Sequence, residues 1–169
     1  REKLAEIADA GAGVLHNAYG DVLTTSTAIA AERSRAREAA WAGLQAGTRT
    51  AVETIFTSPD PAWSLPSQLF TVVKDIVAGA TAPGTGLGLR RQVFSVGLGG
   101  FDTHTNQRVV QDGLFAQLDW SLDAFRRAIA RLGADPAFGA NPPQSTLFTM
   151  SVFGPTFTEN SDGGTDHAI

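Results

Sequence analysis

Two pairs of residues have side chains of the types that ligate metal ions: Asp102 with His104, and Asp166 with His167. Carboxylates and neutral imidazoles together suit zinc, manganese or iron, whereas carboxylates alone suit magnesium or calcium. Asp102 and His104 stand two residues apart and can converge on one cation. Asp166 and His167 are adjacent and must diverge, so they can serve two nearby metals, or one metal and the groups that orient its ligands. The sequence predicts a site for one or two divalent ions: zinc, manganese, calcium or magnesium.

Each pair follows a short apolar run. Residues 92–99 (QVFSVGLG) precede the first pair, and residues 146–154 (TLFTMSVFG) precede the second. Such runs, bounded by glycine, are typical of buried strands, and ligands of open α/β sheets bind beyond the carboxyl ends of the strands. Either pair alone is also common in loops, with Asp as a turn or cap residue and His as a surface imidazole. Their matching positions favour one metal site.

A long helix is predicted between the two apolar runs. Gly133 stands where its C-terminal cap belongs. The order strand, helix, strand predicts a βαβ unit, in which the two strands are parallel and the crossover is right-handed. The apolar residues that recur at spacings of three and four are Val110, Leu114, Leu118, Leu122, Phe125, Ile129 and Leu132.

The chain before the first run is predicted to be helical. Residues 4–23 permit a helix, and the Ala-, Arg- and Glu-rich stretch 27–56 predicts a long, partly exposed helix that Gly43 and Gly47 can interrupt. A further amphipathic helix is predicted to open at Leu65 and Pro66, because proline suits the first helical turn. Its apolar stripe consists of Leu69, Val72, Val73, Ile76 and Val77.

Composition narrows the classes of partner. The 13 Lys and Arg residues against 17 Asp and Glu residues give a net charge of −4, so we expect no nucleic-acid partner. The chain has no cysteine, which excludes disulfides and thiolate metal sites. No apolar run approaches the ~20 residues needed to span a bilayer. Because the sequence stops two residues after the second pair, we expect it to be a piece of a longer protein.

Three blocks of the sequence resemble a family of bacterial proteins catalogued as domain of unknown function 1501. The blocks are RQVFSVGLGGFDTHTNQ, LFAQLDWSLDAFRRAIARLG and TLFTMSVFGPTFTENSDGGTDHA. They agree with the family in order and spacing, and the resemblance covers residues 66–169. That family is similar to the alkaline phosphatase and sulfatase superfamily.

The resemblance implies a fold. Residues 66–169 would be part of a three-layer α/β/α sandwich with a mostly parallel sheet, and residues 1–65 a helical segment, either an insertion or a cap. It also implies that Asp166 and His167 stand for the superfamily's T-x-D-H metal ligands and that Asp102 and His104 stand for the other ligand pair. Family members often carry an export signal, which implies a periplasmic or extracellular location.

The implied activity is metal-dependent hydrolysis of phosphate or sulfate esters, with a small anionic ester as substrate. Asn106 and Asn160 are candidates to bind substrate or orient ligands, although residues of this type more often form turns. The family carries an acidic residue where this chain has Val152 and an arginine where it has Pro155. No residue is assigned as the nucleophile. The alternative function is therefore a non-catalytic binding or assembly protein with a degenerate site on the same scaffold.

Overall fold

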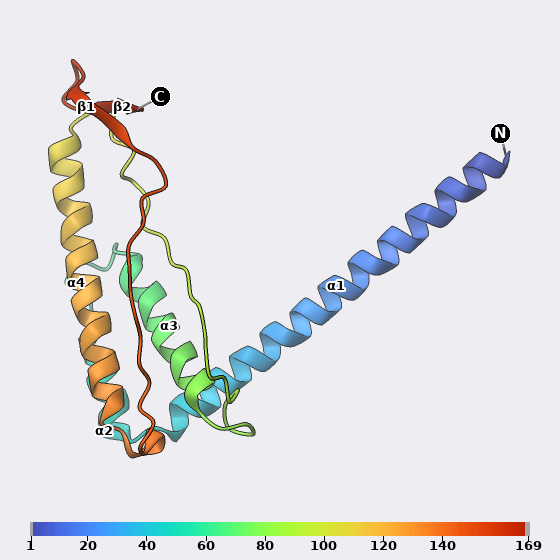
Figure 1. Ribbon diagram of the computed structural model, residues 1–169, viewed down its shortest axis with the longest axis horizontal. Helices are drawn as coiled ribbons and strands as arrows, with labels where there is room; N and C mark the ends of the chain where they lie inside the picture. The colour runs from blue at the N-terminus through green and yellow to red at the C-terminus, as the bar shows by residue number, and fades with distance from the viewer. Residues whose placement is uncertain (1, 168–169) are drawn as a thin grey trace.

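The computed structural model describes residues 2–167, with side chains described from residue 22 onward. Helices dominate the described chain, and a small β-hairpin lies at one end of it (Figure 1). The elements in order are α1 (Glu2–Gly43), α2 (Ala46–Ile55), α3 (Leu65–Ala80), α4 (Gln107–Gly133), the 3-10 helix η1 (Pro136–Phe138), β1 (Pro155–Glu159) and β2 (Thr165–His167). None of the described helices has the length and apolarity needed to cross a membrane.

The helices predicted from the sequence are confirmed. α1 spans the predicted stretch 4–23 and continues to Gly43, where the chain breaks before α2 begins at Ala46. Pro66 lies in the first turn of α3, where its missing N–H has no helical partner to lose. α4 ends at Gly133.

The hydrophobic core lies where the end of α1 meets α2, α3 and α4. From Val22 to Arg35 the side chains of α1 are exposed, and burial begins at Ala36. The core contains side chains from both of the segments predicted from the sequence, residues 1–65 and residues 66–169, so the four helices share one core. Burying each large apolar side chain of this kind stabilises the fold by about 1.5–3 kcal/mol. The most deeply buried are Val52, Val73, Val77 and Leu132.

An ion-pair cluster joins α1 to α3. Asp75 of α3 is only 5% exposed. Its Oδ1 lies 3.0 Å from Nε of Arg37, and its Oδ2 is bound by the guanidinium of Arg33. Because a buried carboxylate is stable only when it is paired, these two arginines fix where α1 meets α3.

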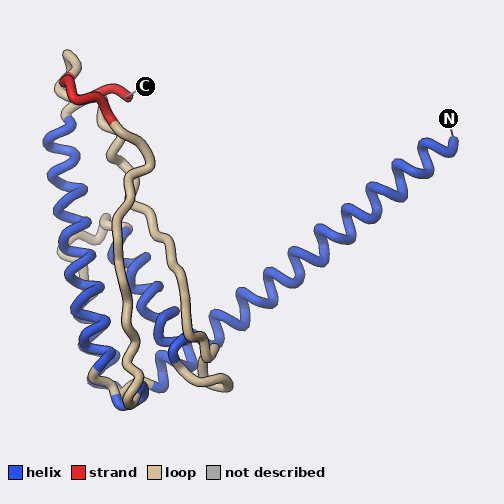
Figure 2. The backbone as a smooth tube through the Cα atoms, in the orientation of Figure 1, coloured by secondary structure: helices blue, strands red, loops and turns tan. Residues whose placement is uncertain are grey.

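The prediction of a three-layer α/β/α sandwich with a mostly parallel sheet is wrong for this structure. The described residues contain one sheet, the hairpin of β1 and β2, and its strands are antiparallel. Residues 92–99 and 146–154 are extended but belong to no strand. They run in the same direction along α3 and α4 toward the hairpin, as the tan segments of Figure 2 show. The chain thus follows the course of a βαβ unit without its sheet.

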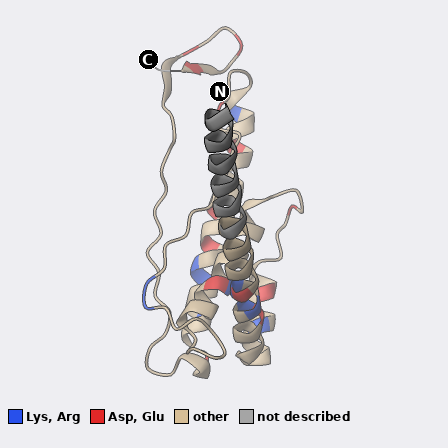
Figure 3. Ribbon diagram, turned by 90° about the vertical axis from the view of Figure 1, so that its right-hand side faces the viewer, with Lys and Arg blue, Asp and Glu red and all other residues tan. Residues whose placement is uncertain are grey.

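The reason is that an extended segment becomes a strand only by pairing. Among the described residues, neither segment forms backbone hydrogen bonds to another extended segment. One face of the first segment packs on the helices through Phe94 and Leu98, while Val93 points outward and is 96% exposed. On the second segment Phe148, Met150 and Val152 are exposed in the same way. Neither segment contains a charged residue (Figure 3).

Candidate metal centre

Asp102 and His104 lie in the loop between the first extended segment and α4. Thr103, between them, is buried, and its hydroxyl accepts a hydrogen bond of 3.0 Å from Nε2 of Gln111 in α4. This bond turns the Thr103 side chain inward. Asp102 and His104, on either side of it, remain exposed. The local sequence therefore presents two potential ligands on a loop that is anchored to a helix.

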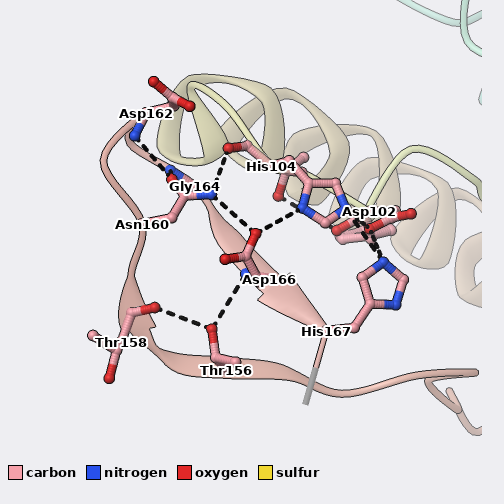
Figure 4. Close-up of polar contacts among 11 residues, drawn as sticks. Asp102, His104, Thr156, Thr158, Asn160, Asp162, Gly164, Asp166 and His167 are labelled. Carbon is pink, nitrogen blue, oxygen red and sulfur yellow. Dashed lines mark hydrogen bonds and ion pairs between the residues drawn. The ribbon is translucent and has the colours of Figure 1, made fainter. Parts of the chain in front are cut away.

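The hairpin brings Asp166 and His167 to the same imidazole ring. β2 carries both residues, and they approach the His104 ring at its two nitrogen atoms (Figure 4). Oδ1 of Asp166 lies 3.2 Å from Nδ1 of His104, and Nε2 of His167 lies 3.2 Å from Nε2 of His104. The rings of His104 and His167 are stacked, with centroids 5.1 Å apart. Asp166 and His167, adjacent in the sequence, thus contact the two different nitrogen atoms of the His104 ring.

Three donor atoms form a nearly equilateral triangle. Oδ1 of Asp102 lies 3.0 Å from Nε2 of His104 and 3.1 Å from Nε2 of His167, and the two Nε2 atoms are 3.2 Å apart. Donors about 2.0–2.1 Å from one ion are about 3.3 Å apart in a tetrahedron and about 2.9 Å apart at neighbouring octahedral positions. The observed separations lie between these values, so the spacing of the three donor atoms is compatible with a divalent transition-metal ion.

Asp166 lies outside the donor triangle, next to Nδ1 of His104. Its pKa is lowered, first by the hydrogen bond from the side chain of Asn160 and then by that with His104, so it is a carboxylate at neutral pH. A carboxylate facing Nδ1 favours a proton on that nitrogen, and Oδ1 of Asp102, 3.0 Å from Nε2, favours a proton on the other one. A metal ion at Nε2 would select the tautomer whose proton lies on Nδ1 and faces Asp166. Asp166 is expected from the sequence as a metal ligand; in the structure its Oδ1 faces Nδ1 of His104 and lies outside the donor triangle.

The two asparagines that the sequence predicts to bind substrate or orient ligands both lie where the hairpin meets the loop before α4. Asn106 is the N-cap of α4 in a left-handed conformation (φ 47°), and its N–H donates to the carbonyl of Asp162. Asn160 lies in the turn between β1 and β2, and its side chain donates to the carbonyl of His104. Asn160 makes both turn contacts, through its Oδ1, and contacts to the His104 backbone and the Asp166 carboxylate, through its Nδ2.

Two neighbours of the site were not expected from the sequence. The ring of Phe153 stacks on that of His167 at 5.8 Å, and an exposed aromatic residue in an apolar run gives no signal for this contact. Gly164 packs so closely on the loop that a Cβ atom would lie 2.2 Å from the carbonyl carbon of His104. The Gly163–Gly164 pair was a signal for such a close approach.

One apolar pocket lies away from the donor triangle. It has a volume of about 310 Å³ and lies between α4 and the start of the second extended segment, and it includes no residue of the donor triangle. Its lining consists of Leu122, Phe125, Arg126, Ile129, Ser145 and Leu147. Because Asp102, His104 and His167 are all exposed, the triangle is an open surface site.

Comparison of the chain with protein-family models, with curated proteins and with solved structures gives no match. The resemblance to domain of unknown function 1501 therefore remains an expectation from the three sequence blocks. The function has to be argued from the donor triangle and the residues around it.

Proposed function

We propose that the protein binds one divalent transition-metal ion through Asp102, His104 and His167 and uses it to hydrolyse small phosphate or sulfate esters. The observation that carries the proposal is the donor triangle, whose sides measure 3.0–3.2 Å. Two imidazoles and one carboxylate are the ligand set of hydrolytic zinc sites and of mononuclear iron sites. Zinc, manganese and iron therefore suit this site better than magnesium or calcium.

The chemistry divides between the ion and the chain. A metal ion bound by such ligands polarises ester oxygens and lowers the pKa of a bound water. The chain supplies Asp102, His104 and His167 as ligands, and Asp166 orients the ring of His104. The Thr103 hydroxyl is buried against Gln111, so water is the nucleophile in this proposal.

The exposure of the ligands supports a small, soluble substrate. The side chains of Asp102, His104 and His167 are 45–60% exposed, so an ester can reach the ion directly from solvent. The chain carries a net charge of −4, which repels anions, and a bound cation supplies the local attraction that an anionic ester needs. The resemblance to an exported family supports a periplasmic or extracellular location.

The test uses the protein loaded with Zn²⁺ or Mn²⁺ and the substrates p-nitrophenyl phosphate and p-nitrophenyl sulfate. We expect turnover that disappears on chelation and returns with the metal. Loss of an outer partner costs about 10–100-fold in metal affinity or activity, so His167→Ala, which removes a ligand, should lower turnover at least about 100-fold. Asp162→Asn is the control, because this exposed hairpin carboxylate lies outside the triangle. Turnover that survives in His167→Ala would contradict the proposal.

A second candidate is a non-catalytic binding or assembly protein that retains the metal site. Val152 is 98% exposed and Pro155 begins β1, at the positions where the resembling family carries an acid and an arginine. An arginine there would offer a bidentate donor to an anionic ester, and proline offers none. The same assay separates the candidates: stoichiometric metal without turnover of either ester favours the second.

A further inference from the structure

Asn160 connects the hairpin to the loop that carries two of the metal ligands. Its Nδ2 donates to the carbonyl of His104 at 2.9 Å and to Oδ1 of Asp166 at 3.3 Å. Its Oδ1 accepts the backbone N–H groups of Asp162 and Gly164, both at 3.0 Å. Four contacts are the full hydrogen-bonding capacity of a carboxamide, so the side chain has one defined orientation (Figure 4).

We propose that Asn160 is a positioning residue of the metal site, which fixes Asp166 against Nδ1 of His104. The inference rests on the proposed metal binding and adds to it the residue that sets the geometry of one ligand. The donor side of the carboxamide touches the His104 backbone and the carboxylate that orients the His104 ring. The acceptor side closes the turn that leads into β2. The Asn160 side chain thus bonds both the Asp166 carboxylate, which faces the His104 ring, and the backbone carbonyl of His104 itself.

The junction has further bonds that keep the hairpin in place when Asn160 is changed. Backbone N–H groups of Asn106 and Gln107 donate to the carbonyls of Asp162 and Gly163, at 3.3 Å and 2.9 Å. The N–H of Thr165 donates to the carbonyl of Thr103 at 3.2 Å. These bonds do not involve the Asn160 side chain. A substitution there should disturb the orientation of Asp166 and leave the hairpin docked.

The decisive variant is Asn160→Asp. It keeps an oxygen to accept the N–H groups of Asp162 and Gly164, and it loses the donor to His104 and Asp166. We expect its dissociation constant for Co²⁺ to rise about 10–100-fold, as for other partners that orient metal ligands, with a change in the visible spectrum of bound Co²⁺. Ser161→Ala is the matched control in the same turn, and we expect it to bind Co²⁺ as the parent protein does.

A double-mutant cycle with Asp166→Asn separates positioning from a general role in the turn. In the double variant the amide of residue 166 can donate to the new carboxylate, while its oxygen still accepts from Nδ1 of His104. We therefore expect a combined loss of Co²⁺ affinity smaller than the product of the two single losses. Purely multiplicative losses would overturn the inference, because they would show that residues 160 and 166 act independently.

Gly164→Ala tests the same junction from the opposite side. A Cβ there would lie 2.2 Å from the His104 carbonyl carbon, so the hairpin must move away from the loop. We expect weakened Co²⁺ binding with unchanged helical circular dichroism, because the core helices lie outside the hairpin. If the parent protein binds no Co²⁺, the proposed metal site itself fails. If the parent binds Co²⁺ and His104→Ala does not, while Asn160→Asp binds normally, only the role of Asn160 is overturned.

Discussion

The Nε2 atoms of His104 and His167 lie 3.2 Å apart, although the two residues are separated by 63 positions in the chain. One comes from the loop before α4 and the other from β2, so α4 and the second extended segment must return the chain to its starting point. The Oδ1 atom of Asp102 completes the triangle at 3.0 Å and 3.1 Å. Long-range folding, rather than a local sequence motif, creates this set of donors.

The ion pairs between α1 and α3 should contribute measurably to stability. Asp75→Ala removes a buried carboxylate and leaves Arg33 and Arg37 without their partner. We expect a loss of about 2 kcal/mol in the free energy of unfolding, below the range for fully buried pairs because Arg33 is half exposed. Urea unfolding followed by far-ultraviolet circular dichroism measures it. Asp123→Ala, which removes exposed ion pairs with Arg126 and Arg127, should cost less than about 1 kcal/mol. Equal losses from the two variants would contradict the role given to Asp75.

Asp135 should make stability depend on acid pH. Burial alone raises the pKa of its carboxyl group. Four neighbours together lower the pKa by more than burial raises it, so the net shift is downward: the Thr48 hydroxyl, the backbone N–H groups of Ala137 and Gln45, and the charge of Arg131. The folded pKa is thus below the unfolded value of about 3.9, so the ionised group stabilises the fold fully above that pH. This stability is lost as the pH falls through the folded pKa.

The measurement for Asp135 compares the parent protein with Asp135→Asn at pH 7 and at pH 3. At pH 7 we expect the variant to lose about 1 kcal/mol in the free energy of unfolding. The N–H groups of Gln45 and Ala137 donate to the two different oxygens of the Asp135 carboxylate, and asparagine keeps only one acceptor oxygen, without the charge. The difference should shrink at pH 3. Asp119→Asn, an exposed change on α4, serves as the control. A difference between Asp135→Asn and the parent that is the same at both pH values would show that the charge of Asp135 is irrelevant.

The outward side chains of the second extended segment test whether this segment is an unpaired surface segment or a buried strand. Phe148 and Met150 are 76% and 79% exposed. Changing both to serine should alter the free energy of unfolding by no more than about 0.5 kcal/mol each and should weaken the binding of hydrophobic dyes. Phe125→Ala, in the buried face of α4, should cost about 3–5 kcal/mol. A loss of several kcal/mol from the serine changes would mean that residues 146–154 form a buried strand.

The helices could be predicted because a helix satisfies its own backbone hydrogen bonds. The spacing of Phe125, Ile129 and Leu132 records which face of α4 meets the core, and Pro66 and Gly133 mark helix ends. The strands could not be predicted in this way, because a strand depends on a neighbour. Val93 and Val152 belong to apolar runs typical of buried strands, but both side chains are exposed. An apolar run does not reveal which other segment, if any, packs against it.

The site was predictable as a group of residues but not in its division of roles. The spacing of the Asp and His pairs placed four side chains near one another. Asp102 lies next to Nε2 of His104, inside the donor triangle, and Asp166 lies next to Nδ1, outside it. The position of Asp166 depends on the turn around Asn160, whose side chain bonds the Asp166 carboxylate. Hydrogen bonds across more than fifty residues leave no periodic signal in the sequence.

The most direct test of the metal centre is equilibrium dialysis of the purified protein against Zn²⁺ near neutral pH. We expect one equivalent of bound zinc for the parent protein and for the Asp162→Asn control. His104→Ala and His167→Ala should each bind substantially less than one equivalent at the same free zinc concentration, because each removes one of three ligands. A parent protein that binds no zinc, or variants that bind it as the parent does, would contradict the metal site. The donor triangle would then be a hydrogen-bonded cluster of surface side chains.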